Sequence, residues 1–293
     1  LIGEVHTVHV WTNRPTWPQG IPTPKGKFTI PKEVNWELWL GTAPYREFNP
    51  TYLPAIWRGW VDFGTGSLGD MGCHFIDVPY RALKLGYPVA VETSVGSVYT
   101  GFFEEAIYPD SYPPSAKTHI QFPARENMPA VEMVWYDGGI RPKRPVELLP
   151  DEEMGEYDGG IIFDGTKGKI MAGLFGRNPT LLPTRKMKET DLPKSKFDFV
   201  EGGTEGHQQQ WVKACKQGFG AYTSSSFDKS GPLTETVLMG NLAVRSYNHF
   251  ETDAKGNRKF NGRKQLLWDG ENMRITNFEP ANQFVKQTSR GGW

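Results

Sequence analysis

The sequence has no excess of charge of either sign, because 33 lysine and arginine residues are balanced by 33 aspartate and glutamate residues. Nucleic acids and anionic membranes select basic surfaces, so this balance gives no reason to expect either as a partner. The chain also lacks any apolar run of about 18 residues, the length that a membrane span requires. A neutral polar ligand is the class of partner that remains.

Cysteine is scarce, since the 293 residues contain only Cys73 and Cys215, each inside a helical pattern. Two thiols imply no disulfide framework, and we expect both to be buried, as unpaired cysteines commonly are. No signal peptide is recognisable at the start, where residues 1–11 have the alternation of a strand already under way. We therefore expect this chain to be part of a longer protein.

The pattern of the chain predicts an α+β fold, a large mostly antiparallel sheet flanked by helices. Stretches of period two follow one another without intervening helices, which argues against a doubly wound sheet. The expected strands span residues 1–11, 89–99, 116–122, 130–136, 160–164, 168–171 and 265–268. The expected helices span residues 35–41, 64–86, 205–217 and 233–245, and polar loops span residues 12–35, 141–158 and 176–203. Pro79 should kink the long helix or restart it after Asp77, because proline cannot donate to the carbonyl four residues back.

A glycine-rich bend leads into the helix around which the chain is organised. At 100° per residue, Asp70, His74, Asp77 and Arg81 fall within roughly 60° of one another. His74 with Asp70 one turn earlier suits proton transfer at a hydroxyl, because a carboxylate on one ring nitrogen fixes the tautomer of the imidazole. The structural alternative is that Asp70 caps the helix and His74 packs beneath it, and spacing alone favours this alternative.

Two other interpretations of this stretch are open. The letters of residues 64–69 match the dinucleotide fingerprint G-x-G-x-x-G, but residues 57–63 are not the apolar run of a buried parallel strand. A glycine bend close to a helix start explains the letters equally well. The acid and the histidine could also begin a metal site, yet only Cys73 and Asp77 lie nearby as further ligands, so we expect no metal.

Aromatic residues are concentrated near the start. Six of the ten tryptophans lie in the first 60 residues, at positions 11, 17, 36, 39, 57 and 60. Flat rings stack well on sugar faces, and a tryptophan-rich core or subunit interface is an equal alternative. On the later helix, His207 could line a pocket, although a surface histidine near a helix start is the commoner case.

Nearly the whole chain carries a series of motifs that belong together. They are Glu4-Val5 to Trp11, Asn13-Arg14-Pro15-x-Trp17-Pro18-Gln19-Gly20, Trp39-Leu40-Gly41, Trp57-Arg58-Gly59-Trp60-x-Asp62-Phe63-Gly64-Thr65-Gly66 and, above all, Gly69-Asp70-x-x-x-His74-x-x-Asp77, followed near the end by Trp268-Asp269 and Asn277-Phe278-Glu279-Pro280-Ala281-Asn282. In this combination the chain resembles the C-terminal domain of the glucose-fructose oxidoreductase / inositol dehydrogenase (Gfo/Idh/MocA) family.

The resemblance implies a two-domain oxidoreductase in which an N-terminal Rossmann domain, not contained in this sequence, holds NAD or NADP. Residues 1–293 would form the substrate-binding and oligomerisation domain, with a possible C-terminal tail over residues 277–293. His74 would be the proton acceptor or donor at the alcohol and Asp70 its partner, while the lysine of the family's Glu-Lys-Pro motif lies outside this chain. The resemblance thus favours the catalytic interpretation of His74 and sets the fingerprint at residues 64–69 aside.

Loop position and chemistry place further side chains around the site. Arg58, Trp60, Asp77 and His207 are candidates for substrate binding, and Arg14 and Trp17 for the cofactor edge. The resemblance implies a sugar or polyol substrate and a homodimer or homotetramer formed through the sheet. Full-length relatives often resemble exported proteins with a twin-arginine signal, which favours the periplasm over the cytoplasm.

Three functions follow from this reading. The first is a dehydrogenase of a sugar, glycoside or polyol hydroxyl that uses NAD(P). The second is a redox-assisted glycoside hydrolase or lyase, which oxidises the ring transiently with tightly bound NAD and eliminates the glycosidic substituent. The third is a non-catalytic carbohydrate-binding or scaffold domain.

Overall fold

A nine-stranded sheet forms the centre of the computed structural model, which describes residues 1–194 and 200–292. The strand order is β13-β12-β2-β5-β6-β1-β7-β8-β9. The strands are β1 (Val5–Thr12), β2 (Ala90–Val95), β5 (Ala116–Phe122), β6 (Val131–Tyr136), β7 (Gly159–Gly165), β8 (Gly168–Ala172), β9 (Thr180–Leu182), β12 (Leu266–Asp269) and β13 (Arg274–Ile275). Seven of the eight neighbouring pairs are antiparallel and β1 with β6 is parallel, so the predicted fold class is confirmed.

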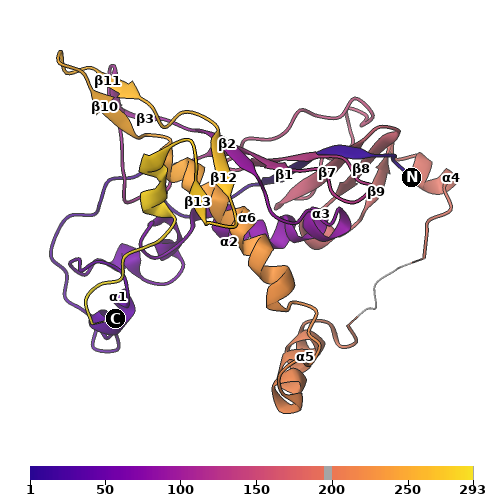
Figure 1. Ribbon diagram of the computed structural model, residues 1–293, viewed down its shortest axis with the longest axis horizontal. Helices are drawn as coiled ribbons and strands as arrows, with labels where there is room; N and C mark the ends of the chain where they lie inside the picture. Colours follow the sequence, from indigo (N-terminus) through magenta and orange to yellow (C-terminus); the bar gives the residue numbers. More distant parts are fainter. Residues whose placement is uncertain (195–199, 293) are drawn as a thin grey trace.

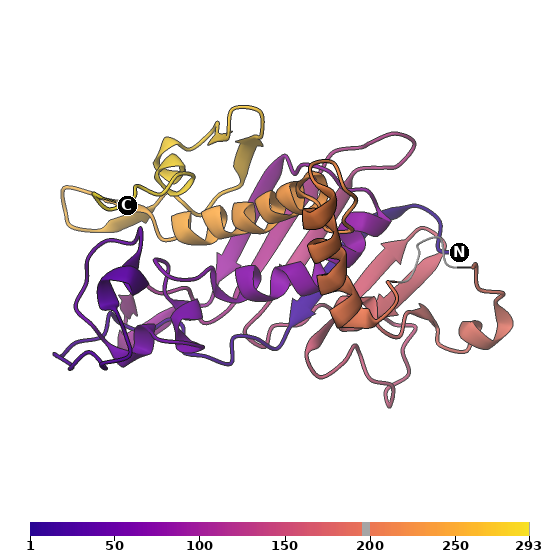
Figure 2. The same ribbon diagram turned by 90° about the horizontal axis from the view of Figure 1, so that it is seen from below.

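Helices cover one face of this sheet, as the view from below shows (Figure 2). The α-helices of the described chain are α1 (Trp36–Leu40), α2 (Gly66–Phe75), α3 (Asp77–Ala82), α4 (Lys186–Glu189), α5 (Gly203–Gln217) and α6 (Phe227–Ser246). Short 3-10 helices add η1 (Pro50–Tyr52), η2 (Ile56–Gly59), η3 (Leu174–Gly176) and η4 (Glu279–Phe284). Whereas α2, α3 and α6 lie against the sheet, α5 projects from the body and has no buried residue (Figure 1). No helix in the described part of the chain is long and apolar enough to cross a membrane.

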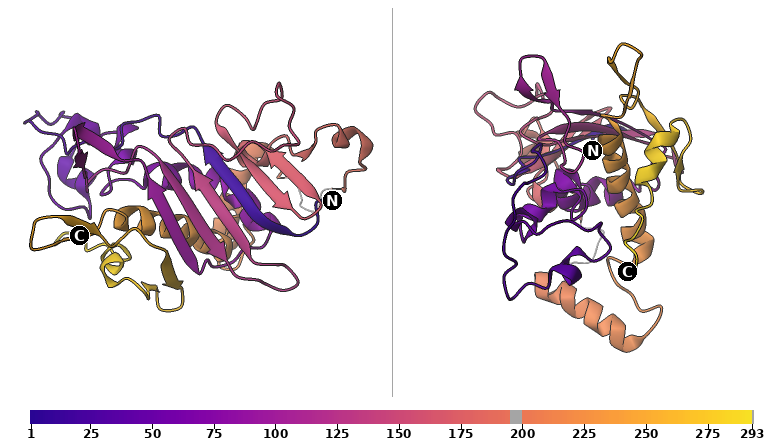
Figure 3. Two further views of the ribbon diagram at one scale, coloured as in Figure 1. Left: turned by 90° about the horizontal axis from the view of Figure 1, so that it is seen from above. Right: turned by 90° about the vertical axis from the view of Figure 1, so that its left-hand side faces the viewer.

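The opposite face of the sheet is partly open. Seen from above, helices do not cover its central strands (Figure 3, left). Lys117, His119 and Gln121 of β5 are half-buried there, because alternate residues of a strand point to opposite faces. Toward β7 and β8 this face carries a second small core, to which the polar loop expected over residues 141–158 contributes buried apolar side chains. That core contains Trp11, Val134, Tyr136, Leu148, Met154, Ile162 and Leu182.

The crossing of α2 over α6 places the central helix on the sheet. Leu68, Met71 and Phe75 form the predicted apolar stripe of α2, and all three are buried. The helices approach closely at Gly240 of α6, where an added Cβ would lie 2.4 Å from the Leu68 side chain. A small residue is therefore required at this crossing.

The long predicted helix over residues 64–86 is two helices. The chain leaves α2 at Phe75 and restarts at Asp77, so the break comes before Asp77 and not after it. The expected burial of Cys73 and Cys215 is wrong, because both thiols are exposed. Cys73 lies off the apolar stripe of α2, and Cys215 lies on a helix that packs against no core.

Other boundaries also differ from the sequence-based ones. The expected strand over residues 89–99 is two strands, because the chain turns at Gly96 into the hairpin of β3 (Val98–Gly101) and β4 (Glu104–Ala106). A second hairpin, β10 (Phe250–Thr252) with β11 (Arg258–Phe260), lies in the C-terminal part. The loop expected over residues 176–203 contains β9 and α4, and its residues 195–199 lie outside the described part.

Candidate functional site

The candidate site lies along the solvent-facing edge of α2 and the start of α3. Burial of the stripe of Leu68, Met71 and Phe75 fixes the rotation of α2 about its own axis. Asp70 and His74 therefore come to the surface and are half-buried, as is the carboxylate residue at the start of α3, Asp77. These half-buried side chains are accessible to a ligand and still held by their surroundings.

Asp70 is engaged by an arginine from the preceding segment. Arg58 of η2 donates a hydrogen bond from Nε to Asp70 Oδ1 at 2.7 Å. Glycine at position 64 lets the chain fold back onto η2, because a Cβ there would lie 2.7 Å from the Arg58 Cα. The guanidinium carbon lies 4.9 Å from the Trp57 ring centroid and 5.9 Å from that of Trp17. This stack of charge and rings orients the guanidinium group beside α2.

His74 is held by an aromatic contact and not by the expected carboxylate. Its ring centroid lies 5.1 Å from that of Phe175 in an edge-on arrangement, with an interplanar angle of 84°. The structure shows no hydrogen bond between His74 and Asp70, and the carboxylate is turned to Arg58, whose guanidinium carries the opposite charge. Asp70 does not cap α2 either, since that helix begins at Gly66, one turn earlier.

Asp77 and His207 belong to a second polar group. Arg81 donates from Nε to Asp77 Oδ1 at 2.7 Å and from Nη2 to the backbone carbonyl of Ser224 at 3.1 Å. The Ser224 hydroxyl lies 3.3 Å from His207 Nδ1 and donates to Gln210 Oε1 at 2.8 Å. The segment between α5 and α6 is thereby tied to α3, and the structure brings His207 to the same side of the molecule as Asp77.

Trp60, which was predicted to bind substrate, lies in a core and not at the candidate site. Trp60 is 1% exposed and packs with Trp36, Leu40 and Tyr52 in a separate small core, so its assignment to substrate binding is wrong. Its indole N–H donates to the backbone carbonyl of Thr51, which leaves no edge for a ligand. For this residue the tryptophan-core alternative is the correct one.

Arg14 lies just after the end of β1. Its Nη1 atom donates to Asp158 Oδ1 at 2.9 Å, and Asp158 follows the loop that covers the second small core. Trp17, by contrast, lies beside Arg58, and its indole N–H donates to Gln19 Oε1 at 2.9 Å. The two candidates for the cofactor edge therefore differ, because only Trp17 touches the group around Asp70.

Sequence reasoning missed Phe175 and Ser224 as parts of this site. Phe175 belongs to η3 and has φ +59°, a left-handed backbone that bulky residues rarely adopt. Neither residue carries a pattern that sequence analysis could have used, because both reach the site through loops far from α2 in the sequence. The positive φ of Phe175 is the structural signal that marks it.

The same residues do not form a metal site or a dinucleotide fingerprint. Within residues 1–194 and 200–292, no group of three or more histidine, cysteine, aspartate or glutamate side chains is arranged to hold a metal ion. The glycines of residues 64–69 follow the 3-10 helix η2 and a single bridge residue, not a strand, so they do not form a dinucleotide fingerprint. Although Cys73 is exposed as a residue, partial desolvation beside α2 raises the pKa of its thiol and the nearby Asp70 carboxylate raises it further, so this thiol is no activated nucleophile.

The comparison with protein families agrees with the motifs. The Gfo/Idh/MocA description "Oxidoreductase family, C-terminal alpha/beta domain" matches residues 14–97. Among solved structures, the super-repressor mutant of Gal80p from Saccharomyces cerevisiae is similar at 12% identity and a TM-score of 0.37, over 84% of this chain and 55% of that one. A levoglucosan dehydrogenase in complex with NADH and L-sorbose is similar at 14% identity and a TM-score of 0.37, over 83% of this chain and 58% of that one.

The chain spans little more than half the length of these two solved proteins. Curated protein sequences give no match. The family match includes Trp17, Arg58, Asp70 and His74, which are the residues that the structure gathers at the edge of α2. The resemblance seen in the motifs is confirmed over residues 14–97, which match the C-terminal α/β domain of the Gfo/Idh/MocA oxidoreductase family.

Proposed function

We propose that this chain supplies the substrate side of an NAD(P)-dependent oxidoreductase that acts on a hydroxyl group of a sugar, glycoside or polyol. The observation that carries the proposal is the state of His74. Its imidazole is half-buried, is braced by Phe175 and makes no hydrogen bond to another residue of the described part. A ring that is positioned but unpaired can meet the hydroxyl of a substrate, as a general acid/base requires.

In the direction of oxidation, His74 takes the hydroxyl proton while the hydrogen on the same carbon leaves as hydride. NAD(P), when bound, supplies the acceptor for that hydride. The glycines at residues 64–69 follow η2 and not a strand, so we propose that the dinucleotide is held mainly by residues outside this chain. Trp17 is the residue here that would touch the cofactor edge, whereas Arg14 is engaged by Asp158.

Asp70 would act through Arg58. The ion pair uses Arg58 Nε, so the Nη2 amino group, which has no partner among the described residues, is left to donate to a substrate oxygen. Asp70 is then a positioning residue that fixes the guanidinium plane. Asp77 would hold Arg81 in the same way and thereby draw the segment around Ser224 toward the substrate.

We also infer that the protein assembles as a homodimer or homotetramer through the open face of the sheet. That face carries half-buried polar side chains of β5, and two of its histidines have polar partners within the chain. His119 lies 3.0 Å from Glu132, and His9 lies 3.0 Å from the Tyr136 hydroxyl. Polar groups that already have partners are compatible with a second surface packing against them.

The test of the activity uses His74→Asn in the full-length protein, with His6→Asn as the matched control. Reduction of NAD or NADP is followed across a panel of sugars, glycosides and polyols, and substrate affinity is measured separately. We expect His74→Asn to lower turnover about 10²- to 10⁴-fold, the usual effect of losing a general acid/base, with little change in affinity. Exposed His6, beside Glu4, should have no effect.

Other outcomes identify the other functions. Release of the substituent of a glycoside without net cofactor reduction, dependent on His74, would assign redox-assisted elimination. Saturable binding of a sugar without any turnover, unchanged in His74→Asn, would assign a carbohydrate-binding or scaffold domain. Turnover that survives His74→Asn at the wild-type rate would refute the role given to the imidazole.

A further inference from the structure

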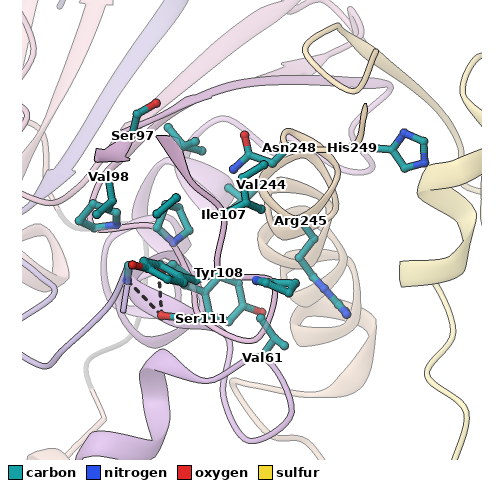
Figure 4. Close-up of a pocket in the computed structure, with 18 of the residues that line it drawn as sticks. Val61, Ser97, Val98, Ile107, Tyr108, Ser111, Val244, Arg245, Asn248 and His249 are labelled. Carbon is teal, nitrogen blue, oxygen red and sulfur yellow. Dashed lines mark hydrogen bonds between the residues drawn. The ribbon is translucent and has the colours of Figure 1, made fainter. Parts of the chain in front are cut away.

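Two adjoining cavities meet at Arg245, near the C-terminal end of α6, and neither is lined by His74 or Asp70. Their volumes are about 280 and 560 Å³, and four residues line both: Val61, Tyr112, Arg245 and Phe284. We call the pair the Arg245 cavity. Figure 4 shows the smaller part, where Val244, Arg245 and Asn248 of the α6 region face Ile107 and Tyr108 across the opening. The Arg245 cavity as a whole has a volume within the range of small-molecule sites.

The Arg245 guanidinium has no carboxylate partner in the described part of the chain. Its carbon lies 4.3 Å from the ring centroid of Phe284, which holds the planar group in place. The carboxylates that line the cavity are engaged elsewhere. Asp62 pairs with Arg46, Glu105 lies 3.3 Å from Arg263, and Glu235 accepts the Trp268 indole N–H at 2.7 Å.

Glu235 is too far from Arg245 to neutralise it. It precedes Arg245 by ten residues on α6, which at 1.5 Å per residue is about 15 Å along the helix axis. The cavity therefore has an unpaired cation at one end and a carboxylate at the other. An anion is favoured at Arg245, and a second anion at the far end is disfavoured.

The side chain of Tyr112 lines the same two cavities as this cation. Tyr112 is 5% exposed, lines both cavities, and its hydroxyl makes no hydrogen bond to another described residue. Burial raises the pKa of Tyr112 to about 12, so the phenol stays protonated and can donate. The hydroxyl is a free donor in a cavity that also holds an unpaired guanidinium, which is an arrangement that a bound carboxylate would complete.

The wall between the two ends is apolar. It is formed on α6 by Leu238, Met239 and Leu242 and on the opposite side by Phe63 and Val285. His249 lies at the rim, where its side chain forms a hydrogen bond with that of Asn261 and points away from Tyr108 and Val61 (Figure 4). This apolar wall would therefore bury the apolar part of a ligand.

We propose that the Arg245 cavity binds a monoanionic organic acid, with the carboxylate on Arg245 and the Tyr112 hydroxyl and an apolar body along Leu238 and Leu242. Such a site is separate from the one around His74, and its occupant would contact both α6 and the C-terminal segment that carries Phe284. The proposal does not depend on the proposed oxidoreductase activity.

The test measures binding of 4-phenylbutanoate to the full-length protein by calorimetry, with the corresponding alcohol, amine and a dicarboxylate of similar length as comparison ligands. We expect saturable binding of the monoacid and at least tenfold weaker binding of the other three. Arg245→Met, which keeps the contact with Phe284, should weaken binding of the acid about tenfold or more, and Tyr112→Phe should weaken it severalfold. The matched control is Arg258→Met, because Arg258 also lies over a phenylalanine ring, 4.9 Å from that of Phe250, and does not line the cavity.

A second variant tests the cavity itself while the charge of Arg245 is kept. Leu238 is 43% exposed, so Leu238→Trp should fill the cavity without disturbing the core, and we expect it to abolish binding while Arg245 remains. Absence of saturable binding by the wild-type protein, or equal binding by Arg245→Met and the wild type, would overturn the proposal. Equal affinity for the acid and its alcohol would do the same.

Discussion

At the scale of single residues, the partner of Asp70 decides what this carboxylate does. Arg58 holds it at 2.7 Å, and the side chains of the pair are 33% and 26% exposed. Water screens a pair of this exposure, so its contribution to stability is at most about 1 kcal/mol. The pair is therefore important for orientation and contributes little to the free energy of folding.

A double-mutant cycle tests this pairing. Asp70→Asn, Arg58→Met and the double variant should give a coupling free energy of roughly 0.5–1 kcal/mol, measured by chemical denaturation, because each substitution removes the same contact. The parallel cycle of Asp70→Asn with His74→Asn should give a coupling close to zero. If the second cycle gave the larger coupling, the carboxylate would hold the imidazole in solution, and the geometry described for Arg58 would be wrong.

The partner of Asp70 could not have been read from the sequence. Helical spacing correctly placed Asp70 and His74 on one accessible side of α2, because that spacing is set by the helix itself. The position of Arg58 depends on how η2 folds back at Gly64, and that of Phe175 on a strand end a hundred residues later. Both are tertiary contacts between segments that have no regular period of their own.

At the scale of elements, the crossing of α2 over α6 sets the position of the candidate site. Gly240→Ala would place a methyl group 2.4 Å from the Leu68 side chain, so we expect a loss of about 1–3 kcal/mol in the free energy of unfolding. Gly231→Ala on the same helix is the control, since nothing lies within 4 Å of its added Cβ. That substitution should stabilise the helix by up to about 1 kcal/mol. Thermal and chemical denaturation of the two variants would measure the difference, and equal stabilities would contradict the packing described here.

Period and turn signals predicted the longer elements and not the short ones. The strand over residues 116–122 was predicted with its exact bounds, because alternation over seven residues is a clear signal. Strands of two or three residues, such as β13 and β9, are too short to show a period. The parallel pairing of β1 with β6 was also invisible, since it joins segments that more than a hundred residues separate.

At the scale of the whole molecule, one face of the sheet is covered by helices and the other is largely bare (Figure 3). Charge balance over the chain leaves no long-range repulsion between two copies. The Lys117 ammonium lies 5.6 Å from the Tyr136 ring centroid near the centre of the bare face. A charge reversal at Lys117 would bury a carboxylate without a partner if copies meet through this face.

The last prediction therefore concerns assembly. Lys117→Glu should shift the full-length protein toward smaller species in sedimentation equilibrium, because an unpaired carboxylate buried at an interface costs several kcal/mol. Lys255→Glu, on the exposed turn between β10 and β11, changes the net charge equally and should leave the mass unchanged. Circular dichroism should show that both variants keep the sheet. A wild-type protein that is monomeric at all concentrations would refute the proposed assembly. An oligomer that Lys117→Glu leaves intact would show that the assembly surface lies elsewhere, because the reversed charge would then face water.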